Sequence, residues 1–293
     1  HGGGLKVLNI SSPSNPFVMG SYYAEPNDGA TDVAVVGSYA YVAYGTSGLR
    51  VVNVSSPSYP YEVGYVDTPG SANGVVVIGG YAYVADGTAG LRVVDISSPW
   101  NPHEVGFYDT PGNAKGVAVV GHYAYVADGT NGLQILNVST PSDLFATGSL
   151  DTPGDSQDVA VSGDHAYVAD GGSGLRVVDV SIPWRPQEEG FYETPGWSMR
   201  LTVAGDLVYL GSYESGLWIL RRITYTISGG VTEAGGFNGI GGVTVWADAT
   251  HSTTTNSQGN YTFTGLPAGT YSITPSRYLY AFSPVLRTVT VPP

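Results

Sequence analysis

The sequence predicts an all-β protein, a β-propeller of four-stranded blades followed by an immunoglobulin-like β-sandwich. Three observations lead to this prediction. A unit of 42 residues recurs without insertion, starting at Val33, Val75, Val117 and Val159. Each unit holds four short segments rich in Val, Tyr, Ile and Ala, which are separated by Gly, Asp, Asn and Pro. No segment shows a sustained 3.6-residue apolar period, so we expect almost no helix.

The third unit shows how one blade is built. We expect strands a, b, c and d at Val117–Val120, Tyr123–Ala127, Leu133–Val138 and Phe145 to about Leu150. A glycine marks the a–b turn in every unit, at Gly37, Gly79, Gly121 and Gly163. Four strands in about 40 residues, repeated along the chain, are typical of propeller blades.

Strand c carries the most regular motif of the unit, G-L-[RQ]-[VI]-[VL]-[DN]-[IV]-S, which returns at Leu49, Leu91, Leu133 and Leu175. Over about residues 1–222 the chain resembles the LVIVD-repeat family. The resemblance implies a β-propeller of the kind found in exported or surface proteins of bacteria and archaea. It implies no particular activity, because a fold does not determine a function.

The two ends of the repeat array are incomplete units. Residues 1–30 align only with strands c and d, and residues 199–222 align with strands a, b and c. The array therefore has five a, five b, five d and six c strands, and we expect five blades, one of them shared by the two ends. Three explanations for the extra c strand stay open. Further blades precede this sequence, Leu217–Leu220 is a linker, or the N-terminal hairpin inserts into a neighbouring molecule.

A second domain follows the repeats, with the boundary placed between residues 1–222 and 223–293. Alternating Tyr261 and Phe263, and then Tyr271 and Ile273, predict strands with one buried face. This region resembles the carboxypeptidase regulatory-like and collagen-adhesin B-type domains, which are prealbumin-like sandwiches that act as stalks, spacers or display modules. The domain contains no lysine, so the Lys–Asn isopeptide crosslink of some relatives cannot form here.

Composition and charge argue against several classes of binding partner. The chain has 24 acidic and 11 basic side chains, a formal charge of -13, which disfavours nucleic acid and anionic lipid. No apolar run reaches the ~18 residues of a membrane span, so we expect no membrane insertion. Cysteine is absent, so neither disulfides nor thiolate chemistry operates here. The sequence opens at His1 without a recognisable leader, which indicates a mature, processed or partial chain.

Acidic residues recur with the unit, and they allow two readings. Asp86, Asp128 and Asp170 open the b–c turns. Carboxylates from several blades could converge on Ca²⁺, or each Asp could accept hydrogen bonds from N–H groups of its own turn. We expect no other cofactor. Gly-x-Ser-x-Gly and Ser-x-x-Lys signatures are both missing, so we predict no enzyme, and a hydrolase with an unrecognised site is the third reading.

The c–d connection, Ser-Ser-Pro-x-x-Pro in most units, carries the most distinctive side chains. Tyr59, Trp100, Trp184 and Arg185 suit sugar stacking or protein contact, or else they pack against the neighbouring blade. Sequons occur at Asn9, Asn53, Asn137 and Asn260. An Asx turn explains the first three as well as glycosylation does, because sibling units have Asp95 and Asp179 there.

These observations favour a non-enzymatic structural or surface protein of the exterior of a bacterium or archaeon. Its expected partner is itself, in a filament or layer built by strand addition between chains. The alternative is an adhesin module that binds glycans or other surface proteins through the aromatic c–d connections.

Overall fold

The computed structural model of the protein describes residues 3–24, 29–221, 225–235, 238–266 and 269–291. The chain divides into two compact units, residues 1–220 and 221–293. The boundary predicted between residues 222 and 223 lies outside the described residues. The described residues form strands and turns, and no helix among them could cross a membrane. The all-β class is therefore confirmed.

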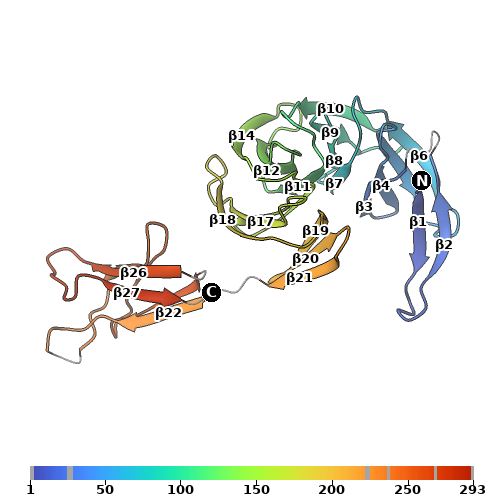
Figure 1. The fold of residues 1–293 in the computed structure, drawn as a ribbon. Helices are drawn as coiled ribbons and strands as arrows, with labels where there is room; N and C mark the ends of the chain where they lie inside the picture. Colours follow the sequence, from blue (N-terminus) through green and yellow to red (C-terminus); the bar gives the residue numbers. More distant parts are fainter. Residues whose placement is uncertain (1–2, 25–28, 222–224, 236–237, 267–268, 292–293) are drawn as a thin grey trace. The chain divides into compact units, whose positions relative to one another are not determined.

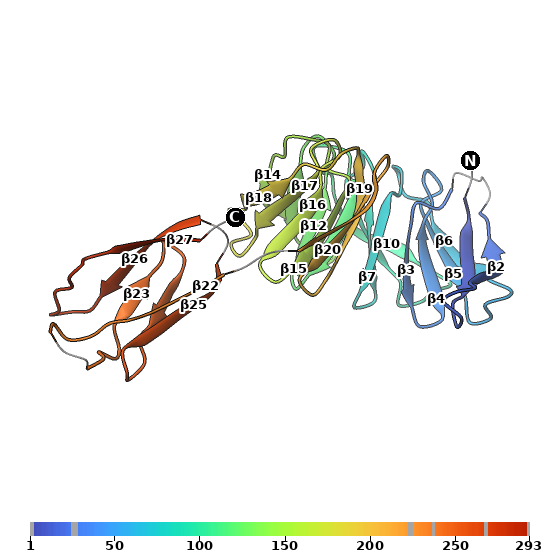
Figure 2. The same ribbon diagram turned by 60° about the horizontal axis from the view of Figure 1, so that its bottom comes forward.

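Four complete blades follow one another in unit 1, each a four-stranded antiparallel sheet of consecutive strands (Figures 1 and 2). Blade one comprises β3 (Asp32–Val36), β4 (Tyr39–Ala43), β5 (Leu49–Asn53) and β6 (Tyr61–Val66). Blade two comprises β7 (Gly74–Ile78), β8 (Tyr81–Ala85), β9 (Leu91–Asp95) and β10 (His103–Tyr108). Blade three comprises β11 (Gly116–Val120), β12 (Tyr123–Ala127), β13 (Leu133–Asn137) and β14 (Phe145–Leu150). Blade four comprises β15 (Asp158–Ser162), β16 (His165–Ala169), β17 (Leu175–Asp179) and β18 (Gln187–Tyr192).

Two incomplete blades flank these four. Among the described residues, β1 (Leu5–Asn9) pairs only with β2 (Phe17–Tyr22). The terminal blade has three strands, β19 (Ser198–Ala204), β20 (Leu207–Ser212) and β21 (Gly216–Arg221). The prediction that both ends share one blade is therefore wrong. The reason is that β21 takes the strand c place beside β20, which leaves no place there for the strand c formed by β1.

The incomplete sheets pack on opposite ends of the row of blades. Leu5 and Tyr22 of the N-terminal hairpin pack against buried residues of blade one, among them Val42 and Val52. Val208 and Leu210 of the terminal blade pack against Tyr167 and other residues of blade four. The N-terminal hairpin is thus covered by its own propeller, and Leu217–Leu220 is a blade strand rather than a linker.

Each hydrophobic core of the propeller lies between two neighbouring blades. Leu49 and Val51 of blade one pack with Val75 and Val84 of blade two, and the same arrangement recurs at the next two junctions. The innermost strands β3, β7, β11, β15 and β19 contact one another in this order. Arg200 of β19 also donates to the carbonyl oxygens of Thr31 and Asn73, at 3.0 and 3.2 Å. The terminal blade therefore comes round to the innermost connections of blades one and two.

A glycine in each strand d receives the c–d connection of the next blade. A Cβ atom added to Gly20, Gly64, Gly106 or Gly148 would lie only 2.1–2.4 Å from the carbonyl oxygen of Pro57, Pro99, Pro141 or Pro183. The absence of a side chain is thus what allows the backbones to approach. The counterpart Gly190 has nothing within 4 Å, because the terminal blade lacks a c–d connection.

Unit 2 is a sandwich of two unequal sheets. One sheet has two strands, β22 (Tyr225–Gly230) and β25 (Asn260–Leu266). The other has four, in the order β24 (Ser252–Thr254), β23 (Thr244–Trp246), β26 (Gly269–Ser276) and β27 (Arg287–Val291). Ile227 and Phe263 of the small sheet pack on Val245 and Ile273 of the large one. The predicted sandwich is therefore present.

Candidate functional site: blade junctions and the uncovered terminal blade

The recurring aspartates join neighbouring blades. Asp86, which follows β8 of blade two, accepts hydrogen bonds from the Thr68 hydroxyl at 2.5 Å and the Gly70 N–H at 2.8 Å, both at the end of blade one. Asp128 and Asp170 bind the threonine and glycine of the preceding blade in the same way. All three carboxylates are fully buried. We call this arrangement the aspartate clasp.

The clasp explains two motifs of the repeat. The threonine and glycine of Asp-Thr-Pro-Gly in one blade donate hydrogen bonds to the aspartate of Asp-Gly in the next blade. Burial raises the pKa of Asp86 and of Asp128, and the hydrogen bonds from threonine and glycine oppose that rise. Within the described ranges no group of three or more His, Cys, Asp or Glu side chains is placed to hold a metal ion. The clasp aspartates thus use their oxygens on the neighbouring blade, whereas the sequence suggested the N–H groups of their own turn.

A buried arginine of strand c reinforces two of the clasps. Arg92 lies 2.7 Å from Asp109 and 4.0 Å from Asp86, and its guanidinium stacks 4.5 Å from the centre of the Phe107 ring. Arg176 is placed similarly, 3.6 Å from Asp170. A planar guanidinium suits such simultaneous pairing and stacking. In the terminal blade Trp218 takes the arginine position.

The aromatic side chains of the c–d connections are exposed. Tyr59, Trp100 and Trp184 are 79%, 65% and 69% exposed, and Arg185 is also exposed. Trp100 nevertheless contacts the neighbouring blade, where its ring lies edge-on to Tyr39 at 6.0 Å. The connection thus packs through its backbone on the glycine of the preceding blade, while most of each large ring faces solvent. Tyr59, Trp100 and Trp184 lie on three different blades, and Arg185 follows Trp184 directly.

The sequon asparagines form turns. Asn9, Asn53 and Asn137 each accept a hydrogen bond from the N–H of the serine two residues later, at 2.9–3.0 Å. Asp95 and Asp179 accept the same bond at 2.8 Å. The shared geometry explains why both residue types occupy this position. Asn260 begins β25 and is exposed, and glycosylation at all four sites stays a prediction.

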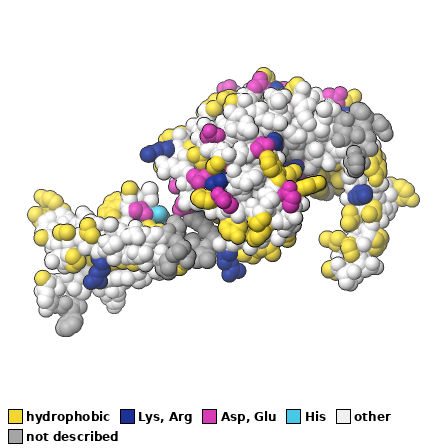
Figure 3. All heavy atoms as spheres, in the orientation of Figure 1, with side chains coloured by type: hydrophobic (Ala, Val, Ile, Leu, Met, Phe, Trp, Pro, Cys, Tyr) yellow, Lys and Arg dark blue, Asp and Glu magenta, His cyan; other side chains and the backbone are white. Residues whose placement is uncertain are grey.

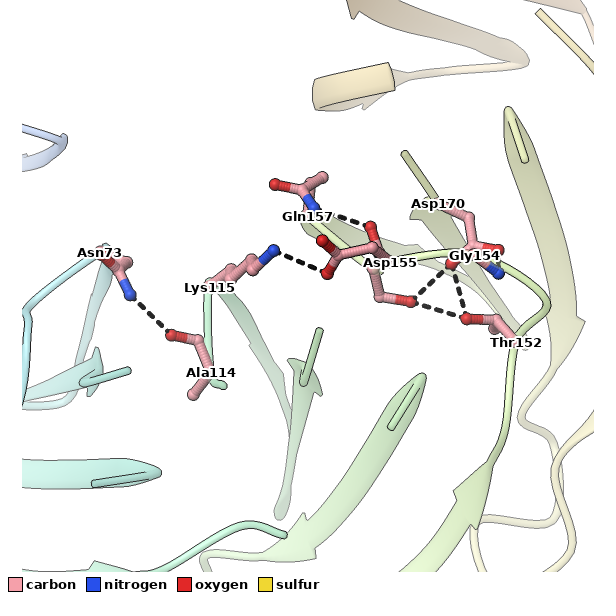
Figure 4. Close-up of polar contacts among 9 residues, drawn as sticks. Asn73, Ala114, Lys115, Thr152, Gly154, Asp155, Gln157 and Asp170 are labelled. Carbon is pink, nitrogen blue, oxygen red and sulfur yellow. Dashed lines mark hydrogen bonds and ion pairs between the residues drawn. The ribbon is translucent and has the colours of Figure 1, made fainter. Parts of the chain in front are cut away.

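A row of unlike polar side chains lies on the connections between blades, each just before an innermost strand. Asn73 donates to the Ala114 carbonyl at 3.0 Å, Lys115 pairs with Asp155 at 2.6 Å, and Gln157 donates to the Asp155 carbonyl at 2.8 Å. Figure 4 shows this row next to the clasp of Asp170. The one lysine of the row is therefore neutralised by a carboxylate of the next connection.

The first residue of the innermost strand differs between the complete blades, as Asp32, Gly74, Gly116 and Asp158, and the equivalent position within β19 is Arg200. The pKa of Asp158 is raised to about 6, mainly by burial and to a smaller extent by Asp32, while the N–H of Leu201 and the guanidinium of Arg200 oppose the rise. Arg200 lies 3.9 Å from Asp158. Asp158 and Arg200 connect the terminal blade to blade four. Their role is structural, and it depends on an arginine that no complete blade has at this position.

The terminal blade carries the largest departure from the repeat. Leu217 and Ile219 of β21 are 65% and 57% exposed, whereas the leucines at the first position are at most 3% exposed in the complete blades, at Leu49, Leu91, Leu133 and Leu175. On the face drawn in Figure 3, hydrophobic side chains gather over the region of β19–β21. Among the described residues no strand pairs with the outer edge of β21. The terminal blade thus presents both an apolar face and an open edge.

Sequence reasoning did not single out Leu217 or Ile219, although a signal was available. The Ser-Ser-Pro-x-x-Pro connection and strand d are missing after Leu220. The absence of that connection and of strand d marks the last blade of the array, and the side of strand c that a following blade covers elsewhere is exposed here.

The clasps, the glycine junctions and the inter-blade cores define a β-propeller built from tandem repeats. The chain belongs to the LVIVD-repeat family, whose model matches residues 1–24, 29–68, 69–110, 111–152 and 153–194. Residues 226–292 match the carboxypeptidase regulatory-like domain. The crystal structure of the computationally designed Ika8 protein is similar in fold, with a TM-score of 0.57 and 9% identity over 94% of this chain and 78% of that one. A search of curated proteins finds no match.

Proposed function

We propose that the protein is a non-enzymatic structural or surface protein of the exterior of a bacterium or archaeon, and that it self-associates through its terminal blade. The acidic, lysine-poor composition and the stalk-type sandwich support an exterior location. The clasp aspartates are engaged in joining blades, which supports a scaffold role for the propeller.

The observation that carries the proposal is the exposure of Leu217 and Ile219 at positions that every complete blade buries or half-buries. Two exposed aliphatic side chains beside an unpaired strand edge form the kind of surface that pairs with another chain. Proteins with open strand edges normally protect them with charge, proline or a covering element. In β21 proline is absent and the one charged side chain is that of Arg221 at its end, so residues 216–220 of the edge are suited to association.

The proposed partner is a second copy of the chain. At each internal junction the residues that cover the counterparts of Leu217 and Ile219 come from the same kind of repeat, so the junction is a contact between copies of one module. A contact between two molecules of this protein would likewise join copies of the same module.

Sedimentation velocity over a range of concentrations tests the proposal. The wild-type protein should form oligomers as its concentration rises, and a Leu217→Ser/Ile219→Ser variant should stay monomeric. Val35 and Val120 are exposed valines on other blades, so a Val35→Ser/Val120→Ser variant is the matched control and should associate like the wild type. A wild-type protein that is monomeric at every concentration would contradict self-association.

A second candidate function, an adhesin that binds glycans, is favoured by the exposed rings of Tyr59, Trp100 and Trp184. A flat aromatic face with little neighbouring cover suits stacking on a sugar ring. Binding to a glycan array that is lost in Trp184→Ala and kept in Phe145→Ala, another exposed aromatic, would support it. Binding that survives Trp184→Ala, Trp100→Ala and Tyr59→Ala together would remove this candidate.

A further inference from the structure

The sandwich of unit 2 has an uncovered region because its sheets differ in width. The two strands β22 and β25 face a sheet of four strands. Among the described residues the outer edge of β22 pairs with no strand. A two-stranded sheet leaves room beside β22, although the core residues Val245 and Ile273 of the large sheet are themselves buried.

A cavity of about 550 Å³ lies where the cover is missing. Its lining includes the consecutive residues 227–234, from the edge strand β22 onward, together with the core residues Val245 and Ile273 of the large sheet. Tyr280 and Phe282, stacked at 6.4 Å, form another part of the wall. Arg277 stacks on Tyr280 at 4.6 Å and donates to the Gly241 carbonyl at 2.6 Å, which fixes that wall. The cavity thus joins an open strand edge to an apolar wall in which Tyr280 and Leu286 are exposed.

The edge of β22 is accessible to another backbone. Ser228, Gly229 and Gly230 have small side chains or none, and Ser228 and Gly230 are exposed. Glycine in a strand often marks a place where another backbone approaches closely. An extended segment could therefore pair with β22 and direct alternate side chains toward the exposed apolar lining residues Tyr280 and Leu286.

The terminal blade supplies a segment with these properties. β21 has an open outer edge, and Leu217 and Ile219 point to the same exposed side because alternate residues of a strand share a face. Trp218 and Leu220, on the other face, pack within the terminal junction. One strand pairing would satisfy the open edges of β21 and β22 together.

We propose that β21 of one copy adds to the free edge of β22 in a second copy, with Leu217 and Ile219 packing on the exposed apolar wall of the cavity at Tyr280 and Leu286. This inference rests on the proposed self-association and names the surfaces that carry it. The contact is β-strand addition, in which main-chain hydrogen bonds supply affinity and alternate side chains supply specificity. Because the two surfaces differ, the contact is heterologous and generates a chain of subunits or a ring.

The other uncovered apolar face of the propeller fits less well. Leu8 and Ile10, in β1 and just after it, are exposed on the side of β1 that faces away from blade one. Packing of that face on Leu217 and Ile219 would bury side chains and leave the edges of β21 and β22 unpaired. Unpaired backbone groups at a buried contact are costly, so the sandwich is the better partner.

Hydrogen exchange of the full chain tests the pairing directly. Amides of residues 225–230 should gain at least tenfold protection as the protein concentration rises through the range of association. Protection that is equal at all concentrations would place the pairing within one chain and overturn the proposal. Association without protection of these amides would also overturn it, and would leave self-association through the terminal blade standing.

Two variants of one loop sharpen the test. Leu286 lines the cavity, whereas Leu279 lies in the same loop, is exposed, and does not line it. Leu286→Glu should weaken association at least tenfold, and the matched control Leu279→Glu should leave it unchanged. Equal association of both variants and the wild type would contradict the assignment of the cavity.

A synthetic peptide of residues 216–221 separates this inference from the proposed function. Added to the full chain, it should protect the amides of β22, and a peptide with serine at the positions of Leu217 and Ile219 should not. Protection by the first peptide in a chain that stays monomeric would support the strand-addition site and contradict self-association. No protection by either peptide would count against the site.

Discussion

The junction between two complete blades and the outer side of the terminal blade are built from the same repeat, yet they differ in every contact. At an internal junction the strand d glycine touches the next c–d connection, the aspartate clasp spans the blades, and the strand c leucine is buried. At the terminal blade these contacts are missing: Gly190 of blade four is uncovered because the terminal blade has no c–d connection, Ser212 stands in place of the clasp aspartate, and Leu217 is exposed on the outer side. The comparison teaches that the stabilising contacts of this fold belong to junctions rather than to blades.

Replacing the strand c leucine should give the largest contrast. Leu133→Ala leaves a cavity at an internal junction and should lower the free energy of unfolding by about 3–4 kcal/mol. Leu217→Ala removes an exposed side chain and should change it by less than about 0.5 kcal/mol in the monomer. Urea denaturation at dilute protein concentration measures both values, and equal losses would show that Leu217 is buried in solution.

Removing an aspartate clasp should cause the second largest loss of stability. Asp128→Ala leaves the Thr110 hydroxyl and the Gly112 N–H without their acceptor, and should cost about 3 kcal/mol. Ser212→Ala, at the matching position of the terminal blade, loses one hydrogen bond to the Pro195 carbonyl and should cost about 1 kcal/mol. Thermal unfolding followed by near-UV circular dichroism would compare the two, and a harmless Asp128→Ala would refute the clasp.

A methyl group on the strand d glycine should have a moderate effect. In Gly106→Ala the new Cβ would meet the Pro141 carbonyl oxygen, so the blades must separate at a cost of about 2 kcal/mol. In Gly190→Ala nothing obstructs the methyl group, and stability should stay within about 0.5 kcal/mol of the wild type. Denaturation midpoints of the two single variants provide the measurement, and a Gly190→Ala loss as large as that of Gly106→Ala would mean that both positions are covered.

The smallest effect concerns the residues that connect the terminal blade to the others. The pKa of Asp158 is raised to about 6 in the folded protein, above its ordinary value of 3.8. Between these values the folded state binds more protons, so this group stabilises the fold as pH falls from about 6 to 4 and disfavours it at pH 7. Asp158→Asn should remove that dependence and be more stable than the wild type at pH 7 by about 1–2 kcal/mol. Stability curves of both proteins between pH 4 and 8 test this, and parallel curves would contradict the raised pKa.

Much of the fold could be predicted because the repeat fixes it locally. The glycine turns and alternating strands define four strands per unit, and the strand inventory of five a, five b, five d and six c agrees with the described sheets. Which sheet each incomplete end joins depends on packing between distant residues. Leu5 and Tyr22 pack on blade one, and Val208 and Leu210 pack on blade four. No local sequence pattern predicts these contacts.

The candidate sites were predictable to a lesser degree. The recurrence of Asp86, Asp128 and Asp170 marked them as special, but their partners Thr68, Thr110 and Thr152 lie in the preceding unit. Because the two halves of the clasp lie in different units, a single sequence shows them as two unrelated turn motifs. Arg200 and Asp158 occupy equivalent positions 42 residues apart, so they approach each other only once neighbouring blades are arranged round the axis. Leu217 resembles its buried counterparts in sequence and differs only through the missing neighbour.

The closeness of the glycine and proline backbones at each junction has an evolutionary consequence. Since every internal junction uses the same pair of surfaces, unequal recombination that duplicates or deletes one 42-residue segment creates no new type of contact. Lineages can therefore change copy number in whole segments. Relatives of this protein should differ from it by integral multiples of the segment far more often than by fractions of one.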